Sequence, residues 1–197
     1  MKLFFIITIA SLFSAAKCTS WCKCRLEDLL IHQYTELDAY RNPWNFLTSK
    51  DRLYLMYMPV SVNLNGIQCV TSEWGKVEIK EKQLQRKVTW IKALQKEKRS
   101  KNVDISITYA RYHEPVPTGF MTDAFPDIGM VFETLYVDNK CLISQIIKVA
   151  DESKKGCTYW VKEEYRDNPL RHCRFLYLIF CTSYQVVYHK TACDDLV

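Results

Sequence analysis

The stretch "GCTYWVKEEY" (residues 156–165) places a cysteine three residues before a tryptophan, and charged residues follow the tryptophan. A tryptophan near a cysteine is common in protein cores, and it also occurs in proteins that hold small molecules. In a strand, alternate side chains share a face, so we expect Thr158 and Trp160 to point the same way. The residues between Cys157 and Trp160 therefore help to decide which ligand a pocket at this tryptophan would accept.

The chain begins with the plan of a secretory signal peptide, residues 1–18. Lys2 is followed by an apolar run, residues 3–13, and then by small residues that predict cleavage after Ala16 or after Cys18. This run is shorter than the roughly 20 residues that a membrane span needs. We therefore expect a secreted, extracellular protein whose mature domain covers residues 19–197, with no membrane association.

Secretion changes how the cysteines are interpreted, because thiols in an oxidising compartment form disulfides. The nine cysteines are Cys18, Cys22, Cys24, Cys69, Cys141, Cys157, Cys173, Cys181 and Cys193. Cleavage after Cys18 would leave an even set of eight, whereas cleavage after Ala16 would leave one unpaired. The chain has no CxxC pair, so we expect no metal site.

The mature chain has the length of one domain, and its charge is mild. Loss of residues 1–18 removes Lys2 and Lys17 and lowers the formal net charge from +5 to about +3. Nucleic-acid-binding domains are usually much more basic, so we expect no nucleic-acid partner. We also expect a monomer.

The pattern along the chain favours strands. Runs rich in β-branched and aromatic residues are separated by turn signals, and Ile105, Ile107 and Tyr109 alternate with polar residues on one such run. The sequence therefore predicts an antiparallel sandwich or barrel. The predicted strands are residues 51–64, 66–74, 103–112, 129–138 and 140–149.

One basic segment permits two interpretations. Residues 78–101 are rich in helix formers with apolar residues at helical spacing, yet Val88 and Trp90 would also share one face of a strand. Ten basic residues against three acids lie between Lys76 and Lys101. They could form a heparin or membrane patch, but the outer, solvated face of a hairpin is favoured.

The C-terminal part predicts two elements. "NPLRHCRFLYLIFC" (residues 168–181) begins with a proline at a helix start and indicates a short buried helix. "SYQVVYHKTAC" (residues 183–193) then predicts a final strand that ends in Cys193.

The order of the motifs "LDAYRNPWNFL", "IQCV", "YVDNKCLI", "GCTYWVKEEYRDNPLRHC" and "VVYHKTAC" behind a secretory signal resembles that of the tick salivary lipocalins, which include the histamine-binding proteins. The resemblance implies a mostly β fold, an eight-stranded antiparallel lipocalin-type barrel with a C-terminal helix packed outside. Such a barrel can hold one small ligand. It implies no cofactor, and it requires residues 83–94 to form a strand.

The resemblance also implies a disulfide scheme. Cys69 should pair with Cys193, and Cys141 with Cys173. Family members often tether the N-terminal segment to the cysteine before the tryptophan, so Cys22 and Cys24 should bond to Cys157 and Cys181, in an order left open.

The resemblance further places a ligand site around Trp160. Amine-binding members carry an aspartate at the position of Leu142 and a glutamate at the position of Thr158. A buried amine cation needs such carboxylates to replace its water. This chain has neither acid, and Phe132 and Tyr109 could still wall a pocket.

Two further residues bear on the ligand. Glu133 could restore one charge to the pocket, although it lies on the face opposite to Phe132. Arg111 lies on the face of Tyr109 and could meet a carboxylate. The altered motif therefore favours a lipid or carboxylate-bearing ligand over a biogenic amine; an amine site rebuilt from Asp123, Asp127 or Glu133 is the alternative.

The function predicted from these observations is a secreted protein that sequesters host inflammatory mediators during feeding. Its four histidines show no local catalytic motif, so an enzyme is not expected. The alternative is an interaction protein whose exterior binds a host immune or haemostatic protein. A ligand found in the native protein would distinguish the two.

Overall fold

The structure is a computed structural model that describes residues 35–109, 117–148, 156–168, 170–181 and 183–194. The predicted signal peptide, with its two cleavage sites, lies outside these residues, as do Cys22, Cys24 and Arg111.

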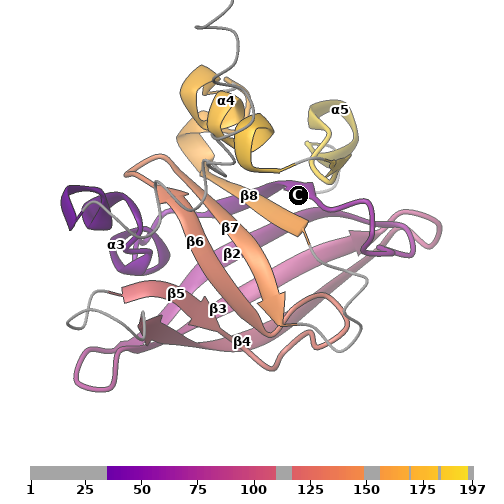
Figure 1. The fold of residues 1–197 in the computed structure, drawn as a ribbon. Coiled ribbons are helices and arrows are strands. Elements are labelled where there is room, and N and C mark those ends of the chain that lie inside the picture. Colours follow the sequence, from indigo (N-terminus) through magenta and orange to yellow (C-terminus); the bar gives the residue numbers. More distant parts are fainter. Residues whose placement is uncertain (1–34, 110–116, 149–155, 169, 182, 195–197) are drawn as a thin grey trace, which may run out of the picture. The chain divides into compact units, whose positions relative to one another are not determined.

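The strands form one antiparallel sheet that closes on itself (Figure 1). Its order is β2-β3-β4-β5-β6-β7-β8-β1, and β1 also pairs with β2 through Leu53 opposite Ser72. The predicted eight-stranded barrel is confirmed, and the two-residue β9 adds to it at β1. The strands are β1 (Leu53–Met58), β2 (Ile67–Glu78), β3 (Gln83–Lys92), β4 (Glu97–Tyr109), β5 (Pro117–Met121), β6 (Val131–Val137), β7 (Cys141–Lys148), β8 (Gly156–Lys162) and β9 (Gln185–Val186).

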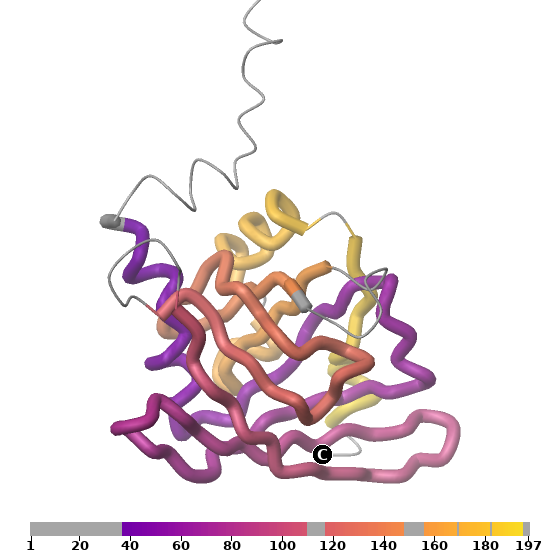
Figure 2. The backbone as a smooth tube through the Cα atoms, turned by 60° about the horizontal axis from the view of Figure 1, so that its bottom comes forward, coloured from indigo at the N-terminus to yellow at the C-terminus, as the bar shows by residue number. Residues whose placement is uncertain are grey.

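The connections alternate between the two ends of the barrel. We call the end with the β1–β2, β3–β4 and β5–β6 connections the mouth, and the opposite end the base. Figures 1 and 2 show the β2–β3 and β3–β4 turns at opposite ends of their strands. The short helix α3 (Trp44–Leu47) lies at the base, where the Lys82 ammonium is 4.9 Å from the Trp44 ring centroid. It follows the 3-10 helix η2 (Thr35–Tyr40).

Within the basic segment, residues 83–92 form strand β3, as the family resemblance required. β3 pairs with β2 on one side and with β4 on the other along its length. These pairings outweigh the helix propensity of its side chains, which is a weak local preference. The even-numbered residues of β3 face the interior, and Leu84, Val88 and Trp90 belong to the core or pack against it.

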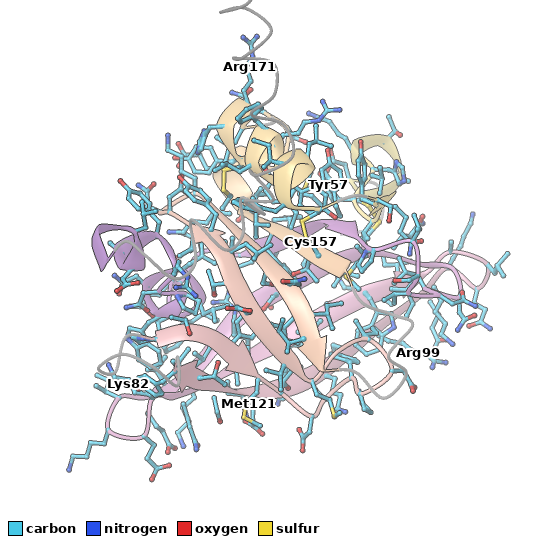
Figure 3. All side chains as sticks on the ribbon, viewed as in Figure 1. Tyr57, Lys82, Arg99, Met121, Cys157 and Arg171 are labelled. Atoms are coloured by element: carbon cyan, nitrogen blue, oxygen red, sulfur yellow. A yellow bond between two sulfur atoms is a disulfide. The ribbon has the colours of Figure 1, made fainter. Side chains whose placement is uncertain are left out.

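Helix α4 (Arg171–Phe180) packs on the outside of the barrel and is tied to it near both ends. Cys173 bonds to Cys141 in β7, and Cys181, just after the helix, bonds to Cys157 in β8. Between them, the Tyr177 hydroxyl donates to the Cys157 carbonyl at 3.2 Å. Figure 3 shows Cys157 beneath this helix. Among the described residues, no helix has the length and hydrophobicity needed to cross a membrane.

The prediction that this helix is buried is only half right. Cys173 and Tyr177, one turn apart, are buried against the barrel. Phe175, Leu178 and Ile179 point away from it and are exposed. A helix that packs on the outside of a closed barrel can bury only one face.

The disulfides correct part of the predicted scheme. The Cys69–Cys193 and Cys141–Cys173 bonds are confirmed. The prediction that Cys157 and Cys181 bind the N-terminal cysteines is wrong, because these two residues are bonded to each other. The reason is the position of α4, which carries Cys181 back over β8 and places its Cα atom 5.8 Å from that of Cys157.

The predicted final strand is also wrong beyond its first residues. β9 ends at Val186, and the chain reaches Cys193 in a short helix, α5 (Lys190–Cys193). The Val187 N–H donates to the Met56 carbonyl at 2.9 Å, and its carbonyl accepts from the Cys69 N–H at 3.0 Å. The segment therefore bridges β1 and β2 where they separate. Strand pairing ends there because Met56 and Cys69 are the last backbone partners that it meets.

Candidate functional site

The barrel encloses a cavity of about 300 Å³ whose lining extends to residues at the mouth. This volume is at the lower end of the range for small-molecule sites, which are mostly apolar with a few placed polar groups. The wall comprises Leu47, Leu53, Leu55, Met58, Leu64, Ile67, Val70, Ser72, Arg86, Val88, Trp90, Lys92, Arg99, Val103, Ile105, Phe120, Thr122, Phe125, Ile128, Gly129, Phe132, Leu142, Thr158 and Trp160.

Three predicted ligand residues come together on this wall: Phe132, Thr158 and Trp160. Trp160 lies between Leu142 on β7 and Leu55 on β1, its partners in the two neighbouring ladders. The Phe132 ring stacks on that of Phe120 with centroids 4.9 Å apart. Strand alternation places Thr158 beside Trp160 on the inner face, as the sequence predicted.

A row of hydroxyl groups runs across β6, β7 and β8 beside the cavity. Thr134 is paired in register with Ser144, and Ser144 with Thr158. The Ser144 Oγ and Thr158 Oγ1 atoms lie 2.6 Å apart and share a hydrogen bond. The Thr134 hydroxyl is buried without a partner among the described residues. The row is neutral, so it offers hydrogen bonds but no countercharge to a buried cation.

No carboxylate of the described residues lines the cavity. Leu142 and Thr158, at which the resemblance places the acids of amine-binding members, both line the cavity. The residue types at these two positions therefore supply no charge to it. Asp123 and Asp127 are exposed in the β5–β6 connection.

Two other predicted residues lie away from the cavity. Glu133 points outward and pairs with Arg41, their side chains 3.4 Å apart, because Phe132 takes the inward direction on β6. Tyr109 is 41% exposed. It lies at the end of β4, where the register with β5 shifts after Thr108, so it does not continue the inward face of Ile105 and Ile107. Tyr109, predicted as a wall of the pocket, and Glu133, predicted to restore a charge to it, therefore do not line the cavity.

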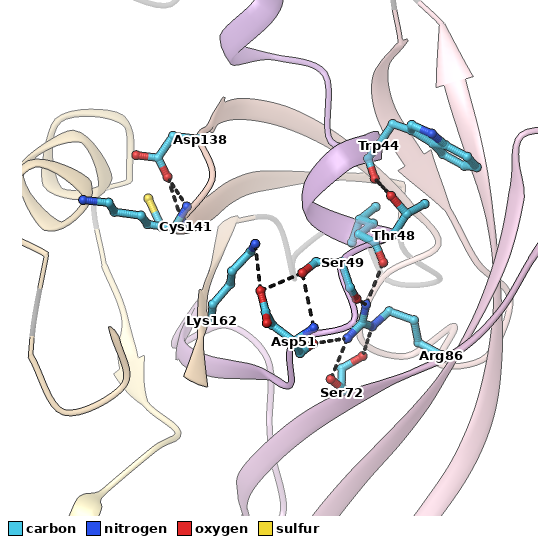
Figure 4. Close-up of polar contacts among 11 residues, drawn as sticks. Trp44, Thr48, Ser49, Asp51, Ser72, Arg86, Asp138, Cys141 and Lys162 are labelled. Atoms are coloured by element: carbon cyan, nitrogen blue, oxygen red, sulfur yellow. Dashed lines mark hydrogen bonds and ion pairs between the residues drawn. The ribbon is translucent and has the colours of Figure 1, made fainter. Parts of the chain in front are cut away.

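Arg86 was not singled out from the sequence, yet it lines the cavity near the base. Figure 4 shows its hydrogen bonds to Ser72 and to the segment that carries Ser49 and Asp51. Its side chain is among the largest fully buried ones. Nε donates to the Ser72 hydroxyl at 2.8 Å, Nη1 to the carbonyls of Leu47 and Ser49, and Nη2 to those of Asp51 and Ser72. All five N–H groups are thus used within the protein, which leaves none for a ligand.

Burial lowers the pKa of Arg86 to about 10, so the group is still protonated at neutral pH. The sequence contained one signal for its position. Arg86 lies between Leu84 and Val88 with the two-residue period of a strand, which puts all three on the same face. Counting it with the solvated basic residues of the segment was wrong.

Lys92 and Arg99 lie at the mouth end of the wall, on the β3–β4 hairpin. Arg99 is the register partner of Trp90, and Lys92 that of Glu97. The Arg99 Nη2 atom lies 2.8 Å from the Glu97 carboxylate. Figure 3 labels Arg99 near this hairpin. Every charged residue that lines the described wall is therefore a cation.

The β5–β6 connection covers part of the mouth. Phe125 and Ile128 contribute to the cavity wall, and the Phe125 ring meets Trp90 edge-on with centroids 5.6 Å apart. The Lys101 ammonium donates to the Ala124 carbonyl at 2.8 Å and lies 5.4 Å from the Phe125 ring centroid. These contacts hold the connection against β3 and β4.

A second cluster, outside the barrel, brings together Asp138, Cys141, His172 and Cys173. Its spacing is short enough for a metal ion, but both sulfur atoms belong to the Cys141–Cys173 disulfide and are not thiolate ligands. The remaining two side chains share a hydrogen bond, with His172 Nε2 2.9 Å from the Asp138 carboxylate. The cluster therefore stabilises the junction of α4 with the β6–β7 turn.

Comparison with known proteins gives one family and several similar folds. The family described as tick histamine binding protein matches residues 31–195. Japanin from Rhipicephalus appendiculatus, solved with cholesterol, superposes with a TM-score of 0.58 at 14% identity, covering 75% of this chain and 97% of japanin.

Two apocrustacyanins also match by structure: lobster apocrustacyanin A1, at 15% identity, and apocrustacyanin C2, at 16%. Both have a TM-score of 0.48 and cover 80% of this chain and 86% of their own. No curated protein sequence matches the chain.

Proposed function

Because this chain belongs to the tick histamine-binding protein family, we propose that it is a secreted lipocalin that takes up a small lipophilic molecule in its barrel and so sequesters a host inflammatory mediator. The family and the fold support small-molecule binding rather than catalysis. Japanin, a neighbour in fold, was solved with cholesterol.

The observation that carries the proposed ligand class is the composition of the cavity wall. It is almost wholly apolar, and among the described residues its charges are Arg86, Lys92 and Arg99. An amine cation placed there would lose its hydration and meet only like charges, which costs several kcal/mol. A neutral or acidic lipophilic molecule would lose little on entry and would gain from the apolar wall.

Titration calorimetry with histamine and displacement of a neutral fluorophore by lipophilic ligands test the proposal together. We expect displacement by the lipophilic ligands and no histamine binding at micromolar concentrations. Sub-micromolar histamine affinity would overturn the proposed ligand class. Sequencing the N-terminus of the secreted protein tests secretion separately, and a start at Lys17 or Thr19 is expected.

A second candidate is the interaction protein whose exterior binds a host immune or haemostatic protein. The exposed apolar face of α4, formed by Phe175, Leu178 and Ile179, favours it, since contiguous exposed apolar surface often marks an interface. Native mass spectrometry of the protein from its natural source separates the two candidates. A bound small molecule supports the first, and an empty barrel supports the second.

A further inference from the structure

We propose that Lys92 and Arg99 form a clamp for the carboxylate head group of an amphiphilic ligand whose apolar part fills the cavity. This inference rests on the proposed function and names the ligand class and the residues that select it. Both side chains line the wall where the β3–β4 hairpin reaches the mouth: Lys92 directly precedes the connection at residues 93–96, and Arg99 follows it by three residues.

The two cations lie on the same inner face of the hairpin. Arg99 is opposite Trp90, and Lys92 is two residues beyond Trp90, so the indole lies next to both in the ladder. A ligand that packs its chain against Trp90 would place its head group between the two cations. Arginine and lysine both bind carboxylates through charge-assisted hydrogen bonds, and arginine can do so with two parallel N–H donors.

Unlike Arg86, neither Lys92 nor Arg99 uses all of its N–H donors in hydrogen bonds within the described part of the protein. Arg99 uses Nη2 on Glu97, an exposed neighbour two residues away, which leaves its other N–H groups for a ligand. The Lys92 ammonium forms no ion pair with the described residues, although the carboxylate of its register partner Glu97 is close enough to attract it. Half of the Arg99 side chain is in contact with solvent, so an acidic head group could reach it without complete desolvation.

Arg86, at the base of the barrel, also favours an anionic ligand. Its buried charge has no carboxylate partner in direct contact, since its five hydrogen bonds go to carbonyl and hydroxyl oxygens. The lining cations therefore give a net positive field at both ends of the cavity, with Glu97 offsetting one of the two charges at the mouth. This field favours an anion over a neutral molecule of equal size and opposes an amine.

The test compares dodecanoic acid with dodecanol, which share a chain and differ in the charge of the head group. Each competes at neutral pH for the cavity with N-phenylnaphthylamine, a neutral fluorophore. We expect the wild-type protein to bind the acid at least about tenfold more tightly than the alcohol. The Lys92→Gln/Arg99→Gln variant should lose this preference and keep its affinity for the alcohol and for the fluorophore.

Two further variants sharpen the result. Lys96→Gln/Lys98→Gln removes the same charge from exposed positions of the same hairpin that do not line the cavity, and it should keep most of the preference. Glu97→Gln frees Arg99 and removes a repelling carboxylate, so it should tighten binding of the acid and leave the alcohol unchanged.

The outcomes separate this inference from the proposed function. Equal affinity of the wild-type protein for acid and alcohol would overturn the clamp and leave a lipophilic cavity. Equal losses in the two double variants would also overturn it, since long-range charge would then explain the preference. If neither the fluorophore nor either ligand binds any variant, the proposed function itself fails.

Discussion

The hydroxyl groups of Ser144 and Thr158 lie 2.6 Å apart on neighbouring strands and share a hydrogen bond in the wall of the barrel. Thr158 stands where amine-binding members of the family carry an acid, and Leu142, two residues before Ser144, stands where they carry the other. A neutral pair thus occupies a region that those members use for charge. Both positions face the cavity.

Introducing the two acids of the amine-binding members at positions 142 and 158 should therefore create an amine site in this protein. In the Leu142→Asp/Thr158→Glu variant we expect histamine to bind at least about tenfold more tightly than to the wild-type protein, measured by titration calorimetry. The carboxylates would replace part of the water that the amine loses. The matched control is Leu142→Asn/Thr158→Gln, which has the same size without the charge and should gain nothing. A comparable gain in the control would contradict the electrostatic explanation.

Arg86 should contribute strongly to stability. Replacement by methionine keeps much of the apolar volume but deprives the carbonyls of Leu47, Ser49 and Asp51 of their donors, at a cost of about 3 kcal/mol or more in the free energy of unfolding. Lys87→Met, at the exposed position next to it, should change that energy by less than about 0.5 kcal/mol. Denaturant unfolding measures both. Similar effects of the two substitutions would show that the hydrogen bonds of Arg86 contribute little to the free energy of unfolding.

The disulfides should differ in how much each contributes to the free energy of unfolding. The Cys69–Cys193 bond spans 124 residues and the Cys157–Cys181 bond 24. In the chain-entropy description, replacing the first pair by alanine should cost about 4–5 kcal/mol and the second about 3–4 kcal/mol. Denaturant unfolding of the two variants gives the comparison, and the opposite order would contradict it. Peptide mapping without reduction should yield the Cys157–Cys181 peptide and none that links Cys157 to Cys22 or Cys24.

Asp138 should make the protein less stable in acid. Burial raises its pKa, but hydrogen bonds from the backbone of Cys141, from His172 and from the backbone of Lys140 outweigh this, and the pKa is lowered below its usual value of 3.8. The folded state thus favours the carboxylate. Its contribution is present above about pH 4 and is lost as the pH falls through the lowered value.

The Asp138→Asn variant tests this pH dependence. Its free energy of unfolding should fall less steeply than that of the wild-type protein between about pH 4 and pH 2. Chemical denaturation across that range provides the slopes. Parallel curves for the two proteins would show that Asp138 does not contribute through its charge.

Local pattern was enough for much of the fold. Alternation on β4 placed Ile105 and Ile107 inside the barrel, since a strand repeats every two residues whatever surrounds it. The same rule placed Thr158 beside Trp160. The order of the motifs along the chain, by resemblance, led to the barrel and to the Cys69–Cys193 and Cys141–Cys173 bonds.

Tertiary structure decided what depends on neighbours that are distant in sequence. Gln83–Lys92 became a strand because β2 and β4 pair with it on both sides, although its residues favour a helix. Cys157 bonded to Cys181 because α4 returns over β8, which spacing in the sequence does not show. On β3 and β6, charged and apolar residues occur together on one face, so the period alone does not show which face becomes the interior. Only closure of the barrel could therefore turn Arg86 and Lys92 inward and Glu133 outward.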